Sequence, residues 1–185
     1  MTAHPEPTMP RITPGDRHDV GLFAYGFARI AGLVTRTNPP NLFLTLGRQP
    51  ALFRGWLGFG RRLMPGGTLP RRETELVILR VAHLRGCSYE YEHHVRLGKR
   101  VGLKPPDFDR LHLGPSANGW TEREAAILSA TDELHLTQDL TDTTWSTLRA
   151  HLSEKEAVEL LMLVGHYEML ATFLLTLRVE PDRHR

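Results

Sequence analysis

Apolar side chains recur along most of the chain with the period of an α-helix, and no segment shows a convincing alternation with period two. The stretch that starts at Pro50 illustrates the pattern, because Leu52, Phe53, Trp56 and Leu57 fall on one broad stripe. The pattern predicts an all-α, single-domain bundle of about seven or eight helices. The short loops between the segments favour antiparallel neighbours.

Prolines, glycines and capping residues divide this pattern into segments. Thr121 and Glu124 have the spacing of a capping box, and Ser153 and Glu156 repeat it. Arg85-Gly86 predicts a hinge between two helices, and Gly102 a C-terminal cap. The expected helices cover residues 19–34, from 50 onward, 70–84, 87–101, 105–111, 121–135, 141–150 and from 153 onward. Residues 41–46 are expected to form no more than a short helical turn.

The N-terminal segment of the chain differs in composition from the rest. Residues 1–17 carry four prolines and no apolar run, so we expect a mobile N-terminal leader there. The remainder, residues 18–185, is long enough for one buried core and is expected to form a single helical domain.

The charge and composition of the chain argue against some classes of binding partner. The formal net charge is only +2, and basic residues form doublets such as Arg61-Arg62 without interleaved aromatics, which argues against nucleic acid. The longest apolar stretch, residues 157–177, is interrupted by Glu159, His166 and Glu168, which argues against a membrane span. Cys87 is the single cysteine, so no intrachain disulfide forms, and a cytoplasmic location is expected.

Candidate chemistry gathers in residues 72–94. Cys87, Glu90, Tyr91 and His94 are spaced so that they share one side of a helix. They stand near the predicted helix start, where the helix dipole lowers the pKa of a thiol or an acid. A glutamate one turn before a histidine can also hold the imidazole in one tautomer. Glu90 is therefore the expected partner of His94 in proton transfer.

Glu75 belongs to the preceding predicted helix. It lies about 15 Å of helix rise before Arg85, and His94 lies about 12 Å beyond Gly86. If the two helices fold back at the hinge, Glu75 and His94 meet across the pair. This arrangement would give two acids and an imidazole in one place.

The run Arg-Arg-Glu-Thr-Glu-Leu-Val-Ile-Leu-Arg-Val-Ala, followed by Gly-Cys-Ser-Tyr-Glu-Tyr-Glu-His-His-Val, resembles the core of carboxymuconolactone decarboxylase family proteins. The likeness extends over about residues 41–177 and includes Gly-His-Tyr-Glu-Met-Leu at 165–170. The alkyl hydroperoxidase D branch has a glutamate 12 residues before a Cys-x-x-Cys-x-x-x-His motif. Glu75, Cys87 and His94 match that pattern, but Glu90 replaces its second cysteine.

This replacement decides which activity the resemblance implies. A disulfide-cycling peroxidase needs a second thiol to resolve the sulfenic acid, so Cys87 alone cannot complete the cycle within one chain. The pattern is more similar to the decarboxylase side of the family, which acts on lactones or small acids without metal or organic cofactor. The resemblance then implies that His94 exchanges the proton, with Glu90 as its partner and Glu75 as a relay. It also implies a homo-oligomer, typically a trimer or hexamer.

Other interpretations remain open at the level of sequence. Cys87 supports a thiol peroxidase with an external reductant, or is simply a small buried side chain. Tyr91 and Tyr167 either bind the substrate or only pack. Glu75, Glu90, His94 and His83 would chelate a metal only with a second Glu-x-x-His element, so no metal is expected. A non-catalytic oligomeric binding protein is the third alternative.

Overall fold

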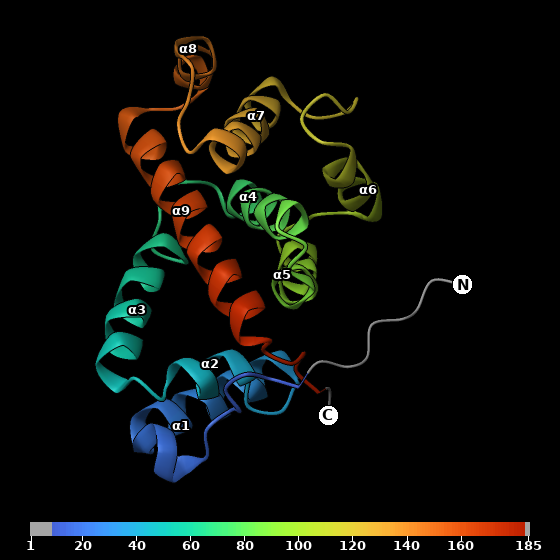
Figure 1. The fold of residues 1–185 in the computed structure, drawn as a ribbon. Coiled ribbons are helices and arrows are strands. Elements are labelled where there is room, and N and C mark those ends of the chain that lie inside the picture. The colour runs from blue at the N-terminus through green and yellow to red at the C-terminus, as the bar shows by residue number, and fades with distance from the viewer. Residues whose placement is uncertain (1–8, 184–185) are drawn as a thin grey trace. The chain divides into compact units, whose positions relative to one another are not determined.

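The computed structural model describes residues 9–183, and the chain forms nine α-helices and no strand within that range (Figure 1). The helices are α1 Arg17–Thr35, α2 Asn41–Leu46, α3 Pro50–Leu63, α4 Arg71–Leu84, α5 Ser88–Arg100, α6 Pro105–Leu113, α7 Glu122–Thr137, α8 Asp142–His151 and α9 Glu154–Leu177.

The all-α prediction is confirmed, but the described residues hold nine helices where seven or eight were expected. The difference arises because the short segments also close helical turns, with α2 the shortest at six residues. The predicted capping boxes form as expected. Thr121 accepts from the backbone of Glu124 at the start of α7, and Ser153 exchanges hydrogen bonds with Glu156 at the start of α9.

The predicted leader is ordered over its described part. The Arg11 N–H donates to the Leu177 carbonyl, the Gly15 N–H donates to the Leu44 carbonyl, and Asp16 caps α1. Because of this cap, α1 begins at Arg17, before the predicted start at Asp19. Residues 1–8 of the predicted leader lie outside the described residues.

The chain divides into two compact units, with boundaries inside α3 and α9. One unit holds the segment up to Phe59 together with the segment from Thr172, and the other holds residues Gly60–Ala171. The single domain expected over residues 18–185 stays a prediction. The first unit is built around Val20, Ala24, Leu46 and Phe53, with aromatic rings packed edge-on around Phe53.

Helix α4 is the core element of the second unit and packs against α5, α6 and α7; Figure 1 shows α4 and α5 side by side. Every residue of α4 from Glu73 to Ala82 is buried. Its leucines Leu76 and Leu79 form an apolar cluster with Leu103, Leu111 and Leu128. A helix covered on so many sides also buries its polar side chains.

The connection between α4 and α5 is tight. Gly86 has φ +63°, a left-handed conformation that suits glycine because it has no Cβ. The Cys87 N–H donates to the Ala82 carbonyl, which closes the end of α4. The turn at the predicted hinge therefore sends α5 back along α4.

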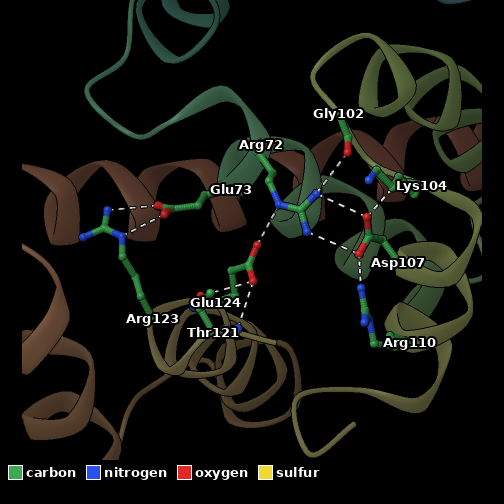
Figure 2. Close-up of polar contacts among 9 residues, drawn as sticks. All are labelled: Arg72, Glu73, Gly102, Lys104, Asp107, Arg110, Thr121, Arg123 and Glu124. Atoms are coloured by element: carbon green, nitrogen blue, oxygen red, sulfur yellow. Dashed lines mark hydrogen bonds and ion pairs between the residues drawn. The ribbon is translucent and has the colours of Figure 1, made fainter. Parts of the chain in front are cut away.

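Ion pairs tie the first turn of α4 to its neighbours (Figure 2). Arg72 bonds Asp107 of α6 at 3.2 Å and Glu124 of α7 at 2.8 Å. Arg123 of α7 bonds Glu73 at 2.8 Å and also reaches Glu156 of α9 at 2.6 Å. We call Arg72, Glu73, Asp107, Arg123, Glu124 and Glu156 the α4 ion-pair network.

Helix α9 has 24 residues and is long and apolar enough to cross a membrane by those two criteria alone. Core helices of soluble proteins pass the same test. In the most apolar 18-residue segment of this helix, 44% of the residues are buried within the protein. Its buried residues include His166 and Tyr167.

Candidate functional site

Glu75 and His94 meet across the α4–α5 pair, as the spacing predicted. Oε2 of Glu75 lies 2.7 Å from Nδ1 of His94, and the other oxygen, Oε1, accepts from Nη2 of Arg71 at 2.7 Å. Glu75 is fully buried and His94 is 6% exposed. The carboxylate therefore bridges a guanidinium and an imidazole out of contact with solvent.

This bridge defines what His94 can do. A carboxylate held at Nδ1 fixes the orientation of the ring and favours the tautomer that carries its proton on Nδ1. Nε2 is then the nitrogen left to take or give a proton. The sequence suggested Glu90 as the partner of His94, but the hydrogen bond is made by Glu75, because the helical hairpin brings it to the ring.

Glu90 is buried beside this pair without a hydrogen bond. It is 2% exposed, and neither carboxyl oxygen has a hydrogen-bond partner among the described residues. Burial raises the pKa of Glu90 to about 8, a rise that Glu168 adds to and Cys87 and Arg85 oppose. The expected lowering by the helix start is thus reversed by desolvation, and Glu90 is a neutral acid at pH 7.

Cys87 is not an activated thiol. It is 1% exposed and precedes α5 as the capping residue, and its side chain makes no capping hydrogen bond. Burial, reinforced by the charge of Glu90, raises the pKa of Cys87 to about 12. The thiol lies near the Glu90 carboxyl. Our expectation of a lowered pKa at the helix start was wrong because burial outweighs the dipole.

Tyr167 of α9 packs against His94, beside Glu75 and Glu90. Its ring meets the His94 ring edge-on, with centroids 5.2 Å apart, and its hydroxyl contacts Sδ of Met64 at 3.7 Å. Burial and the charges of Glu75 and Glu90 raise the pKa of Tyr167 well above its usual value. Its hydroxyl therefore stays protonated and can donate a hydrogen bond.

Tyr91 points elsewhere, although it shares the predicted face with Cys87. Its hydroxyl lies 2.7 Å from Nε2 of His112, and the His112 ring stacks on His83 at 4.6 Å. These three rings and Cys87 belong to a shallow depression of about 270 Å³. Its lining is completed by Ala82, Gly86, Ser88 and Glu92. The structure does not bring Tyr91 to Glu75 and His94.

His93 and His83 lie in different surroundings. His93 packs against His94 with ring centroids 5.4 Å apart, and burial lowers its pKa to about 3, so it is a neutral neighbour. His83 is exposed beside His112, away from the buried acids. No cluster of three or more histidine, cysteine or acidic residues over residues 9–183 has the geometry of a metal site.

Two residues that contact these side chains, Arg71 and Met64, were not predicted from the sequence. Arg71 stands four residues before Glu75 on the same helix, the ordinary spacing of an ion pair, and this signal was available. Met64 offers no comparable signal, because only the packing of α9 places Tyr167 against it. We call Arg71, Glu75, Glu90, His94 and Tyr167 the buried acid–base cluster.

The cluster brings together side chains that can donate or accept protons. It combines an oriented imidazole, a neutral carboxylic acid and a phenol that stays protonated, all shielded from water. An oriented imidazole can act as a general base or acid, and a neutral acid can stabilise a developing oxyanion. These are the parts that general acid–base catalysis requires.

The family profile that matches this chain is that of the carboxymuconolactone decarboxylase family, over residues 50–133. The matched region contains Arg71, Glu75, Cys87, Glu90 and His94. Tyr167 lies beyond it. No curated protein matches the chain by sequence.

Solved structures similar to the chain share its fold. The alkylhydroperoxidase AhpD core protein of Ralstonia eutropha aligns with TM-score 0.82 and 19% identity, over 97% of this chain and 94% of that one. A putative antioxidant defence protein AhpD of Agrobacterium tumefaciens aligns with TM-score 0.69 and 22% identity, over 74% and 94%. The apo debrominase Bmp8 aligns with TM-score 0.75 and 17% identity, over 92% and 91%. These likenesses confirm the AhpD-like all-α fold that the sequence predicted.

Proposed function

We propose that the protein is an enzyme that moves protons on a small organic acid or lactone without metal or organic cofactor, in an isomerisation or decarboxylation. The observation that carries the proposal is the buried hydrogen bond between Glu75 and His94, 2.7 Å long, beside the neutral acid Glu90. Perturbed, buried titratable groups gathered in one place are typical of catalytic sites.

We assign His94, Glu90 and Glu75 separate roles in the proposed proton transfer. His94 takes a proton from the carbon next to a substrate carbonyl through Nε2, and the electron pair left behind moves onto the carbonyl oxygen. Glu90 stabilises that oxygen with a hydrogen bond from its O–H and keeps its proton, and His94 later returns the abstracted proton to carbon. Glu75 keeps the ring oriented and stabilises the imidazolium while it exists. For decarboxylation, the same acid groups would protonate the carbanion that remains after CO₂ leaves.

The test is solvent-deuterium exchange, because proton abstraction appears there even without net turnover. A panel of small oxo acids and unsaturated γ-lactones is incubated with the protein in D₂O and followed by proton NMR. We expect exchange with at least one compound. The variant His94→Gln should slow it by about 100- to 10,000-fold, the usual contribution of a general acid–base group.

His83→Gln provides the matched control, because this exposed histidine lies outside the cluster. It should leave the exchange rate unchanged. Equal rates for wild type and His94→Gln on every exchanging compound would remove the proposal, as would the absence of exchange across the panel. That second result would favour the non-catalytic binding protein.

The peroxidase alternative has less support. A buried Cys87 with a pKa of about 12 holds almost no thiolate at neutral pH, and the thiolate is the form that attacks peroxide. Peroxide consumption with dithiothreitol as reductant would separate the two activities. We expect none above that of Cys87→Ala.

We also propose that the chain acts on small molecules and assembles as a homo-oligomer, a trimer or hexamer, in the cytoplasm. Support for assembly comes from α1, where Leu22, Phe23, Ile30, Leu33 and Val34 are 52–68% exposed. Exposed apolar side chains gathered on one helix are typical of an interface. Light scattering coupled to size exclusion should give a mass of three or six protomers, and a monomer at micromolar concentration would contradict it.

A further inference from the structure

Helix α1 has an exposed face that is both apolar and positively charged. Leu22 and Leu33 on this face are 68% and 64% exposed. After Asp19 the helix carries a single charged residue, Arg29. Because Arg29 stands seven residues after Leu22 and four before Leu33, it lies on the same side of the helix. Arg36 caps the C-terminal end of α1 and adds a second positive charge.

The two arginines of this face are not used within the chain. Arg29 and Arg36 are exposed, and neither side chain forms an ion pair or hydrogen bond with another described residue. Arg48, in contrast, pairs with Asp19 at 3.2 Å in the same compact unit. The positive charge of the α1 face is therefore available to a partner that carries acidic groups.

A groove of about 380 Å³ in the second unit has the complementary character. Its apolar lining consists of Leu134, Leu140, Trp145 and Leu161. Trp145 is 39% exposed and Leu161 is 37% exposed, so this apolar surface is open to contact. The charged residues of the lining, Asp139 and Asp142, are both acidic. We call this feature, which α7, α8, α9 and the α7–α8 loop form, the α7–α9 groove.

The negative charge of the α7–α9 groove is not balanced within the described chain. Oδ1 of Asp139 accepts from the N–H of Leu140 at 2.8 Å, and Asp142 is the first residue of α8, where the helix dipole favours an acid. Neither carboxylate forms an ion pair with a described residue, and no basic side chain lines the groove. An apolar segment that carries basic residues matches this lining.

A trimer, or a hexamer built from trimers, requires two different surfaces that fit each other. A contact about a twofold axis pairs one patch with itself and stops at a dimer, whereas a threefold contact joins unlike patches of successive copies. The α1 face and the α7–α9 groove are unlike patches that both expose apolar side chains and carry opposite charges. Contact of α1 with a second α1 would instead bring arginines together, which is unfavourable.

We propose that α1 of one copy docks in the α7–α9 groove of the next copy, with the two arginines of the helix beside the two aspartates of the groove. The inference rests on the proposed assembly and names the two surfaces that form it. Docking removes the exposed apolar side chains of both surfaces from water and pairs charges that have no partner within the chain.

Charge reversal on the full chain tests this pairing. Asp139→Arg/Asp142→Arg makes the groove basic and should raise the dissociation constant of the assembly about 100-fold or more, because like charges then meet. Arg29→Glu/Arg36→Glu makes the α1 face acidic and should have an effect of similar size. The variant with all four substitutions again has opposite charges, and its dissociation constant should return to within about tenfold of wild type. Sedimentation velocity at nanomolar to micromolar concentrations measures these constants.

Asp109→Arg/Glu122→Arg is the matched control. It reverses two exposed acids outside the groove, and Glu122 is the first residue of α7, as Asp142 is of α8. This variant should assemble like wild type. Urea denaturation shows whether each variant is folded. If a reversal does not fold, the milder Asp142→Asn and Arg29→Gln carry the test, and each should weaken assembly about three- to tenfold.

The outcomes separate this inference from the proposals on which it depends. A wild-type chain that stays monomeric overturns both the proposed assembly and the pairing. If the wild type assembles, a groove or helix reversal without effect overturns the pairing alone, and so does failure of the fourfold variant to reassemble. The proposed proton transfer is tested separately, by deuterium exchange.

Discussion

Two groups of charged side chains begin in the first turns of α4, and burial affects them in opposite ways. In the α4 ion-pair network, burial alone would raise the pKa of Asp107, but hydrogen bonds from Arg72, the Lys104 backbone and Arg110 outweigh it and lower that pKa to about 2 (Figure 2). In the buried acid–base cluster nothing comparable reaches Glu90, and its pKa rises to about 8. The same desolvation gives a paired anion in one place and a neutral acid in the other.

The comparison separates stability from chemistry. Paired carboxylates hold helices together and have no proton to give at neutral pH. An unpaired buried acid destabilises the fold when it ionises, yet it is a proton donor near pH 7. We therefore expect substitutions in the network to change stability, and substitutions in the cluster to change proton transfer and its pH dependence.

The largest expected effect concerns the thiol beside the unpaired acid. With a pKa of about 12, Cys87 should react with iodoacetamide roughly a thousandfold more slowly at pH 8 than a free cysteine with its pKa of about 8.5. The rate should still rise about tenfold per pH unit at pH 10, because the thiolate fraction is still increasing. Mass spectrometry of the alkylated chain gives the rate, with glutathione as the reference. A rate that levels off by pH 9 would show an ordinary thiol.

The next effect tests the paired region. Arg123→Ala removes the partner of Glu73 and Glu156 and should lower the free energy of unfolding by about 3 kcal/mol, since it leaves Glu73 buried and unpaired. Urea denaturation measures this change. Arg62→Ala, at an exposed position, should stay within about 0.5 kcal/mol of wild type. Deuterium exchange at saturating substrate should be unchanged in Arg123→Ala, and a large loss there would break the separation between the two regions.

A smaller effect of opposite sign is expected at the unpaired acid. The folded protein holds the Glu90 proton up to about pH 8, while the unfolded chain releases it near pH 4.5, so stability falls as the pH rises between these values. Glu90→Gln removes this penalty and should raise the free energy of unfolding at pH 7 by about 2.5 kcal/mol relative to pH 5. Thermal melting at the two pH values measures the difference between variant and wild type. An identical pH dependence in both would mean that Glu90 ionises normally.

Much of this arrangement was predictable from local sequence. The capping boxes at Thr121 and Ser153 and the hinge at Gly86 depend on nearby residues, and all three formed as expected. The meeting of Glu75 and His94 followed from helix rise on either side of that hinge, because a hairpin of two helices leaves little freedom.

The electrostatic state of the cluster was not predictable. It depends on how completely Cys87 and Glu90 are covered, and helix-start rules say nothing about tertiary burial. The assignment of the His94 partner failed for a related reason. Glu90 is near in sequence, but Glu75 is the acid that the hairpin places at the ring.

The central claim is that Glu90 is a neutral, buried acid beside an oriented imidazole. Carbon-13 NMR of glutamate side-chain carboxyls, titrated from pH 4 to 10, tests it most directly, with Glu90→Gln as the assignment. The account predicts one carboxyl that titrates near pH 8 in the wild type and is absent from Glu90→Gln. If the signal that disappears in Glu90→Gln instead titrates below about pH 5, close to an ordinary glutamate, the claim is contradicted.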